Sequence, residues 1–224
     1  MFSVSNTWKA TYPGAASGVL IMHEVINPDH NPALDAKKTS LELELRRDYE
    51  ELDRPALLEI PPFPAYSDYY KRFKKTYHVY LQFESLVKKG KSIPSVAALV
   101  ESMFMAELKD RLLTAGHDLD KVQGEPRLEI ALGNEAYTTL QSQRKTLKPG
   151  DMYIHDEAGV ISSVIYGPDQ RTQISKTTQK VMFTVYAPPG IGEQPVKRHL
   201  EEIRENILLF ANQSKTELLR VFIA

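Results

Sequence analysis

Residues 152–166, MYIHDEAGVISSVIY, decide the fold class of this chain. The runs 152–155 and 160–166 are rich in β-branched and aromatic side chains, which favour strands. Between them, Asp156-Glu157-Ala158-Gly159 has the composition of a hairpin turn. The stretch therefore predicts two antiparallel strands. Further strands are predicted over 127–131, 136–140 and 181–187, so that residues 124–191 form a strand-rich region.

Helical periodicity dominates on both sides of this region. Apolar residues recur there at three- and four-residue spacing, which indicates amphipathic helices. The helices are predicted over 33–53, 66–76, 82–89, 95–113 and 195–211, and additional strands over 2–8, 18–26 and 218–223. Because helices and strands do not alternate regularly, the pattern favours an α+β fold of packed layers. We expect one domain over residues 1–224, with residues 1–65 packed on the rest.

The composition is that of an ordinary globular protein. The 224 residues are 42% hydrophobic and 25% charged with a net charge of −1, which excludes a disordered, collagen-like or globally basic protein. The absence of cysteine excludes disulfides, thiolate nucleophiles and zinc–thiolate sites. No secretory signal pattern or apolar run of membrane length is present, so we expect a cytoplasmic protein without membrane contact.

The sequence carries no common cofactor signature. The patterns GxGxxG, GxxxxGKS/T, HExxH and GxSxG are all absent, which removes support for nucleotide-binding, metalloprotease and α/β-hydrolase functions. His155 and Asp156 could suggest a metal site, but adjacent residues of a strand point to opposite faces. We expect neither a metal nor a cofactor.

The first candidate site is the segment 114–120, TAGHDLD, which we expect to be a loop between a helix and the strand-rich region. His117 can transfer a proton near neutral pH, and Asp120 is spaced to orient its imidazole if the loop turns. Alternatively, the segment is a surface turn in which Asp118 or Asp120 caps backbone amides.

The second candidate site is the segment 165–172, IYGPDQRT, in which a turn follows an apolar strand. Arg171 could hold a carboxylate or a phosphate through a bidentate pair of hydrogen bonds. The alternative is a loop with an exposed arginine that has no ligand.

A third feature is a cluster of basic residues with tyrosines between them. Tyr69, Tyr70, Tyr77 and Tyr80 accompany the cations, and aromatic rings can stack on unpaired bases while basic groups pair with phosphates. Alternatively, the cations form a solvated face and the tyrosines belong to the core. The residues predicted to bind RNA are Lys71, Arg72, Lys74, Lys75, Lys88, Lys89 and Lys91.

Four motifs in order resemble the B3/B4 domain of the phenylalanyl-tRNA synthetase beta subunit, and more closely the free-standing bacterial and archaeal proteins built from that domain. The resemblance covers about residues 74–190. Its motifs are LLTAGHDLD at 112–120, PRLEIALGNEAYTTL at 126–140, DEAGVISSVIYG at 156–167 and TQKV at 178–181.

The resemblance implies a three-layer fold of two packed sheets and a helical layer. In the synthetase this domain carries the site that hydrolyses tyrosine wrongly esterified to the phenylalanine tRNA. By the resemblance, His117 falls on the pocket histidine and becomes the proton-transfer group, with Asp120 as its orienting partner. Ser163 and Val164 replace paired glycines and Thr184 replaces a glutamate, which implies a narrower and less acidic pocket.

The resemblance thus implies a tRNA-editing-like module that binds, or also hydrolyses, an aminoacyl-tRNA or an aminoacyl ester. The alternative is a binding module for RNA or amino acids that keeps the fold without catalysis. tRNA is the expected partner, and no obligate protein partner is expected. We expect His117 to line one concave pocket with Ser163, Val164 and Thr184. The predicted substrate-binding residues are Ser163, Val164, Tyr166, Gly167, Arg171 and Thr184.

Overall fold

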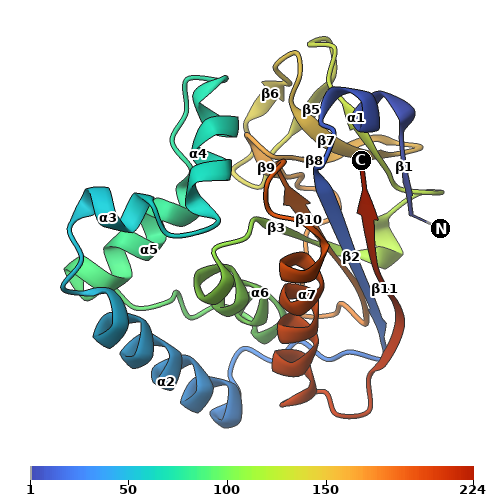
Figure 1. Ribbon diagram of the computed structural model, residues 1–224. Coiled ribbons are helices and arrows are strands. Elements are labelled where there is room, and N and C mark those ends of the chain that lie inside the picture. Colours follow the sequence, from blue (N-terminus) through green and yellow to red (C-terminus); the bar gives the residue numbers. More distant parts are fainter. Residues whose placement is uncertain (1) are drawn as a thin grey trace.

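The computed structural model describes residues 2–224 and has an α+β fold (Figure 1). Sheet A has the strand order β1-β4-β7-β8-β9, and sheet B has the order β11-β2-β10-β3. A two-stranded ribbon of β5 and β6 accompanies them. Each sheet contains strands from both halves of the sequence, so the layers assemble from distant segments.

Sheet A is built around the hairpin predicted from residues 152–166. Asp156 of β7 pairs with Gly159 of β8, and the glycine has φ 125°, a value that L side chains rarely adopt. β1 and β4 pair in parallel, and the remaining pairs are antiparallel. The strands of the sheet are β1 (Ser3–Val4), β4 (Arg127–Ile130), β7 (Met152–Asp156), β8 (Gly159–Ser163) and β9 (Gly167–Pro168), and those of the ribbon are β5 (Ala136–Thr138) and β6 (Arg144–Thr146).

Sheet B places β10 between β2 and β3, in fully antiparallel register. Seven of the eight residues of β10 are buried, as expected for a strand covered on both faces. On β3, which lies at the edge of the sheet, Gly116 lies opposite Phe183 and His117 lies opposite Met182. The strands are β2 (Ala16–His23), β3 (Thr114–Asp118), β10 (Lys180–Ala187) and β11 (Lys215–Ile223).

The two sheets pack face to face, and helices cover the other face of sheet B. Tyr186 of β10 contacts the hydroxyl of Ser162 of β8 across the space between the sheets. On the opposite face, Gly18 of β2 lets α7 approach so closely that a Cβ at this position would lie 2.6 Å from Val196 Cγ1. α6 (Ala98–Asp110) and α7 (Glu193–Leu208) form this helical layer (Figure 1). The order of layers is therefore sheet, sheet, helices.

The remaining helices pack through an aromatic cluster beside sheet B. The rings of Tyr66 and Tyr77 stack with centroids 4.1 Å apart, and the ring of Phe63 meets that of Tyr80 edge to face at 5.1 Å. The Tyr66 hydroxyl donates to the carbonyl of Tyr186, which ties this cluster to β10. The helices are α1 (Asn6–Thr11), α2 (Pro32–Tyr49), α3 (Arg54–Leu58), α4 (Phe63–Lys71) and α5 (His78–Lys89), with a short 3-10 turn over Leu119–Lys121.

Two local expectations are wrong. The predicted strand over residues 2–8 is limited to Ser3–Val4, because Ser5 accepts a hydrogen bond from Trp8 N and starts α1 instead. The segment 114–120, expected to be a loop, forms the edge strand β3 followed by the 3-10 turn. Among residues 2–224 no helix is long and apolar enough to cross a bilayer.

Candidate functional site

A cavity of about 690 Å³ lies between α5, α6 and the edge strand β3. Val100, Met103 and Phe104 form its wall on α6, and Gly116 lies on its β3 side. Ile165, Ile174 and Leu140 add apolar surface from three connecting segments. The polar groups on its lining are fewer and come from separate elements. They include Asn27, His78, Gln82, Glu107, Thr114, Tyr166, Gln173 and Lys176.

Glu107 is the buried acidic group of this cavity. Its side chain is on α6 and the residue is only 3% exposed, and Oε1 accepts a hydrogen bond from Thr114 N at 2.8 Å. Burial raises the pKa of this carboxyl to about 8, because a low-dielectric surrounding disfavours its charge. The cavity therefore contains a carboxyl that can exchange a proton near neutral pH.

Sequence reasoning missed Glu107, although a signal was available. It follows Leu99 and Met103 at four-residue intervals and so continues the apolar stripe of the predicted helix. A carboxyl on the buried side of a helix is costly unless it has a partner or a function. His78 and Asn27 gave no comparable signal, because they lie near α5 and in the segment after β2 and meet only in the folded chain.

His117 does not line this cavity. Successive side chains of a strand point to opposite faces, so Gly116 faces the cavity and His117 faces the space between the sheets. His117 is fully buried, with Nδ1 2.8 Å from Thr172 Oγ1. Burial, together with the nearby Arg171 charge, lowers the pKa of His117 to about 3. The imidazole is therefore neutral at physiological pH.

Asp120 does not orient His117. Its carboxylate lies 3.0 Å from Lys180 Nζ at the surface, and its backbone N–H donates to Asp118 Oδ1. The alternative of an aspartate that caps a turn is confirmed for Asp118. The partner that holds the His117 ring is Thr172, which is 55 residues away in the chain.

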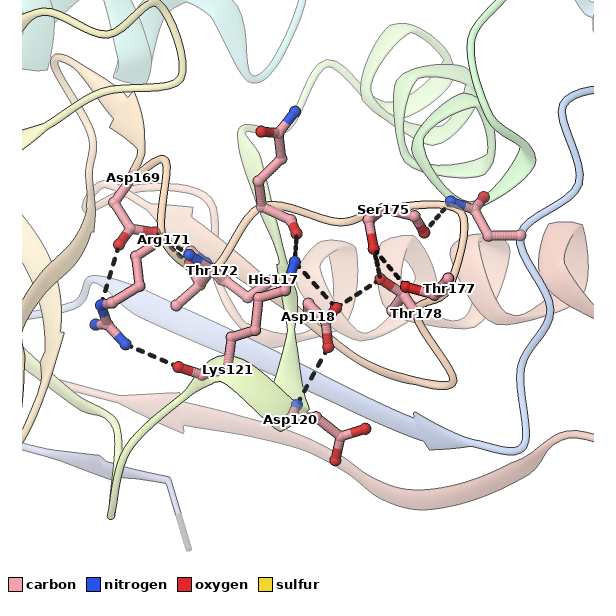
Figure 2. A network of polar contacts seen from close by, with 12 residues as sticks. His117, Asp118, Asp120, Lys121, Asp169, Arg171, Thr172, Ser175, Thr177 and Thr178 are labelled. Carbon is pink, nitrogen blue, oxygen red and sulfur yellow. Dashed lines mark hydrogen bonds and ion pairs between the residues drawn. The ribbon is translucent and has the colours of Figure 1, made fainter.

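Arg171 is held by groups of the protein itself. Its Nη2 donates to Asp156 Oδ1 at 2.8 Å and its Nη1 donates to the Lys121 carbonyl at 2.8 Å, while Nε lies 3.7 Å from Asp169 Oδ2. Figure 2 shows how this arginine continues through Asp169 and Thr172 into one polar network. The network joins the loop after β9 to β3 and positions both.

The same network anchors the far end of β3. Asp118 Oδ2 accepts a hydrogen bond from Thr178 Oγ1 at 2.8 Å, and Thr178 in turn accepts from Ser175 N (Figure 2). Ser175 and Lys176 belong to the loop that lines the cavity. The polar network is therefore structural support for the cavity rim rather than the site itself.

The expected pocket of His117, Ser163, Val164 and Thr184 is not present. Ser163 and Val164 are each 1% exposed and Thr184 is fully buried, and none of them lines the cavity. The predicted residues that do line it are Tyr166 and Gly167, which lie where the chain passes from β8 to β9. The residues of the second candidate segment thus separate into cavity-lining and structural groups.

The basic residues are exposed, but they lie near the two ends of α5. Lys71 and Lys75 border a separate cavity near the start of that helix, and Lys91 borders a groove beyond its end. A 12-residue helix is about 18 Å long, so these cations do not form one compact patch. The tyrosines cannot stack on bases, because Tyr69, Tyr70, Tyr77 and Tyr80 are at most 2% exposed.

Comparison with known proteins identifies relatives for most of the chain. The model of the B3/4 domain family matches residues 65–204, a longer span than the motifs alone indicated. The phenylalanine–tRNA ligase beta subunit of Mycoplasma pneumoniae is 35% identical over 69 residues, which cover 31% of this chain and 9% of the relative. The same subunit of Corynebacterium jeikeium is 38% identical over 66 residues, which cover 30% of this chain and 8% of the relative.

A solved structure supports the same assignment at the level of the fold. An N-terminal fragment of the phenylalanyl-tRNA synthetase beta subunit from Pyrococcus horikoshii aligns with the whole chain and with 54% of the fragment. The TM-score is 0.52 and the sequence identity is 12%. The matches to the curated relatives span less than a tenth of their length, so the match concerns one domain of a longer protein. With more than half of its residues matched by the family model, this chain belongs to the B3/4 domain family.

Proposed function

We propose that this chain binds the aminoacylated 3′ end of a tRNA, or an equivalent aminoacyl ester, in the cavity between α6 and β3. Two observations support the proposal. The named relatives are subunits of a ligase that joins phenylalanine to tRNA. The chain itself has a cavity of about 690 Å³, within the range of small-molecule sites of roughly 300–1,000 Å³.

The observation that carries the proposal is the buried carboxyl of Glu107 among apolar walls. An aminoacyl ester presents one cationic ammonium group and one side chain. Glu107 can pair with the ammonium, while Val100, Met103 and Phe104 contact the apolar part of the side chain. A charge pair in a desolvated site is strong when both groups are satisfied, which suits a single-ammonium ligand.

A path for the nucleic acid leads out of this cavity along α5. An adjoining groove shares His78, Gln82 and Phe104 with the cavity and continues to Lys91. Lys89 follows Ser85 of this groove by four residues and therefore lies on the same helix face. We assign the phosphate contacts to these cations and to Lys176 on the cavity rim, rather than to the group at the start of α5.

Hydrolysis of the bound ester is a second candidate function, favoured by the pKa of Glu107 near 8. A carboxyl with this pKa can accept or donate a proton at the pH of the cell. The catalytic roles derived from the resemblance for His117 and Asp120 stay predictions, and variants of Glu107 and His117 separate the two assignments. A cytoplasmic location accompanies the proposal, because charged tRNA is used there.

The proposal is tested by calorimetric titration with a 3′-phenylalanylamido adenosine, in which a stable amide replaces the ester. The wild-type chain is expected to bind it more tightly than adenosine alone, and Glu107→Gln should weaken the complex by at least about tenfold. The matched control is Ser102→Ala, which removes a buried hydroxyl on the same helix away from the cavity.

Three outcomes count against this function. Failure of the wild-type chain to bind the amide overturns it, and so does equal affinity of Glu107→Gln and wild type. Stronger binding of adenosine than of its aminoacyl derivative would assign the cavity to a nucleoside. Incubation with a panel of mischarged tRNAs, scored by release of the amino acid, tests the hydrolytic candidate separately.

A further inference from the structure

Thr114, His199 and Asp110 form a continuous chain of polar contacts beside the cavity. Thr114 Oγ1 lies 2.7 Å from His199 Nε2, and His199 Nδ1 lies 3.0 Å from Asp110 Oδ2. The three residues come from β3, α7 and the end of α6. The histidine is 85 residues from Thr114 in the sequence, so the packing of α7 on sheet B creates this arrangement.

The direction of each hydrogen bond follows from the chemistry of the groups. An ionised carboxylate only accepts, so Asp110 fixes the proton of His199 on Nδ1. His199 Nε2 then carries a lone pair and accepts the hydroxyl proton of Thr114. This is the order of nucleophile, base and orienting carboxylate found in nucleophilic catalysis.

The burial of these residues places the hydroxyl between the base and the cavity. Thr114 lines the cavity and is 5% exposed, whereas His199 is fully buried and does not line it. Val196, Leu200 and Ile203 flank the imidazole along the buried face of α7. A fully buried imidazole on an apolar helix face is costly unless its polar atoms are used, and both ring nitrogens are used here.

A backbone amide that could stabilise an oxyanion lies two residues further along β3. Thr114 N donates to Glu107 and Asp118 N donates to the Thr172 carbonyl, so both point away from β10. Backbone groups alternate between the two edges of a strand, and the Gly116 N–H therefore points to the same edge. Gly116 also lines the cavity, which puts this donor beside the hydroxyl.

We propose that Thr114 is a nucleophile that takes the acyl group from an ester bound in the cavity, with His199 as its base and Asp110 as a positioning residue. This rests on the proposed function, because it assumes that the cavity receives the ester. The bond from Thr114 Oγ1 to the acyl carbon forms as the bond to the alcohol oxygen breaks. The hydroxyl proton passes to His199 Nε2 and then to the leaving alkoxide.

Water completes the reaction through the same base. It attacks the Thr114 ester and gives its proton to His199, which returns the proton to Thr114 Oγ1 as the carboxylic acid leaves. The Gly116 N–H donates to the carbonyl oxygen when that oxygen becomes negative. The alcohol released from an aminoacyl-tRNA is the terminal ribose hydroxyl. No electron transfer and no further reactant are needed.

The experiment uses a β-lactone with an apolar side chain, which acylates hydroxyl nucleophiles and leaves a slowly hydrolysed ester. Intact-mass measurement and peptide mapping of the full chain should show one adduct on Thr114. Thr114→Ser should keep the adduct, and Thr114→Val should lose it. His199→Gln and Asp110→Asn should slow its formation by about 10²–10⁴-fold. Ser102→Ala should react like the wild-type chain.

The pH profile separates a positioning role of Asp110 from a structural one. The wild-type rate should rise with pH as His199 becomes neutral and then reach a plateau, and Asp110→Asn should shift this rise. A purely structural effect would lower thermal stability and leave the position of the rise unchanged. An unmodified wild-type chain overturns the proposal, and so does equal labelling of Thr114→Val. If the phenylalanylamido adenosine still binds in either case, the binding function survives and only the nucleophile is rejected.

Discussion

Gly116 and His117 are adjacent on β3, yet they face opposite sides of sheet B. Gly116 lines the cavity, whereas the His117 imidazole lies between the two sheets with Nδ1 2.8 Å from Thr172 Oγ1. A candidate site assigned to a loop could have included both residues. In a strand, the alternation of side chains allows only one of them to meet the ligand.

Gly116→Ala is expected to narrow the cavity. A Cβ at this position would lie 2.9 Å from Ile174 Cδ1, and the end of the Ile174 side chain also borders the cavity. The side chain can turn away only into the space that the ligand uses. Affinity for the phenylalanylamido adenosine should therefore fall by about fivefold or more, with a stability loss of about 1 kcal/mol or less.

The control for Gly116→Ala is Gly18→Ala, whose Cβ would lie 2.6 Å from the buried Val196 on the far side of sheet B from sheet A. Overpacking there should cost about 1–3 kcal/mol of unfolding free energy while ligand affinity stays unchanged. Denaturant unfolding and titration of both variants check this. The cavity assignment is wrong if the two variants change affinity equally.

His117→Gln should lower stability near neutral pH, with a loss that shrinks in acid. In the folded chain the pKa of His117 is about 3, below the unfolded value of about 6.5, so only the unfolded state binds a proton between these values. The stability that the wild-type histidine confers falls as the pH drops below 6.5, by up to about 1.4 kcal/mol per pH unit. Urea unfolding at pH 7, 6 and 5 measures the difference between variant and wild type.

The same variant tests the catalytic role derived from the family resemblance. A proton-transfer group at His117 predicts a loss of hydrolysis of about 10²–10⁴-fold. A structural histidine predicts hydrolysis unchanged per folded molecule. Rates normalised to the folded fraction at each pH distinguish these results.

Glu107→Gln should stabilise the chain while weakening its ligand complex. The folded pKa of about 8 exceeds the unfolded value of 4.5, so the unfolded state ionises first and wild-type stability falls as the pH rises from 4.5 to 8. The variant lacks this loss. Its advantage should grow on the order of 1 kcal/mol per pH unit between pH 5 and 8. A stability difference that is independent of pH would show that Glu107 is already ionised in the folded chain.

Two groups of charge variants should differ in their effect on tRNA binding. Removing Lys89 and Lys91 together should weaken tRNA binding and lower its salt dependence by about one unit of slope per lost phosphate contact, because these cations adjoin the groove that leads to the cavity. Removing Lys71 and Lys75 should have the smaller effect. Filter binding over a range of salt concentrations compares them, and the reverse order would place the RNA path at the start of α5.

The long periodic elements could be predicted because their own residues determine them. The helix predicted over 33–53 is α2, and the hairpin predicted over 152–166 joins β7 and β8 at the expected turn. Segment 114–120 could not be assigned in the same way. A glycine, a histidine and two aspartates have weak strand preference, and β3 forms because β10 pairs with it and Thr172 anchors its end.

The sequence by itself determined the family, the α+β class and the position of most helices and strands, since these depend on local motifs and on the period of the apolar residues. Only the tertiary structure decided which polar groups meet. Thr114 reaches His199 and Glu107 enters the cavity because α6 and α7 pack on one face of sheet B. His117 lies on the other face, since a contact across a sheet depends on strand register and layer order, which neighbouring residues do not encode.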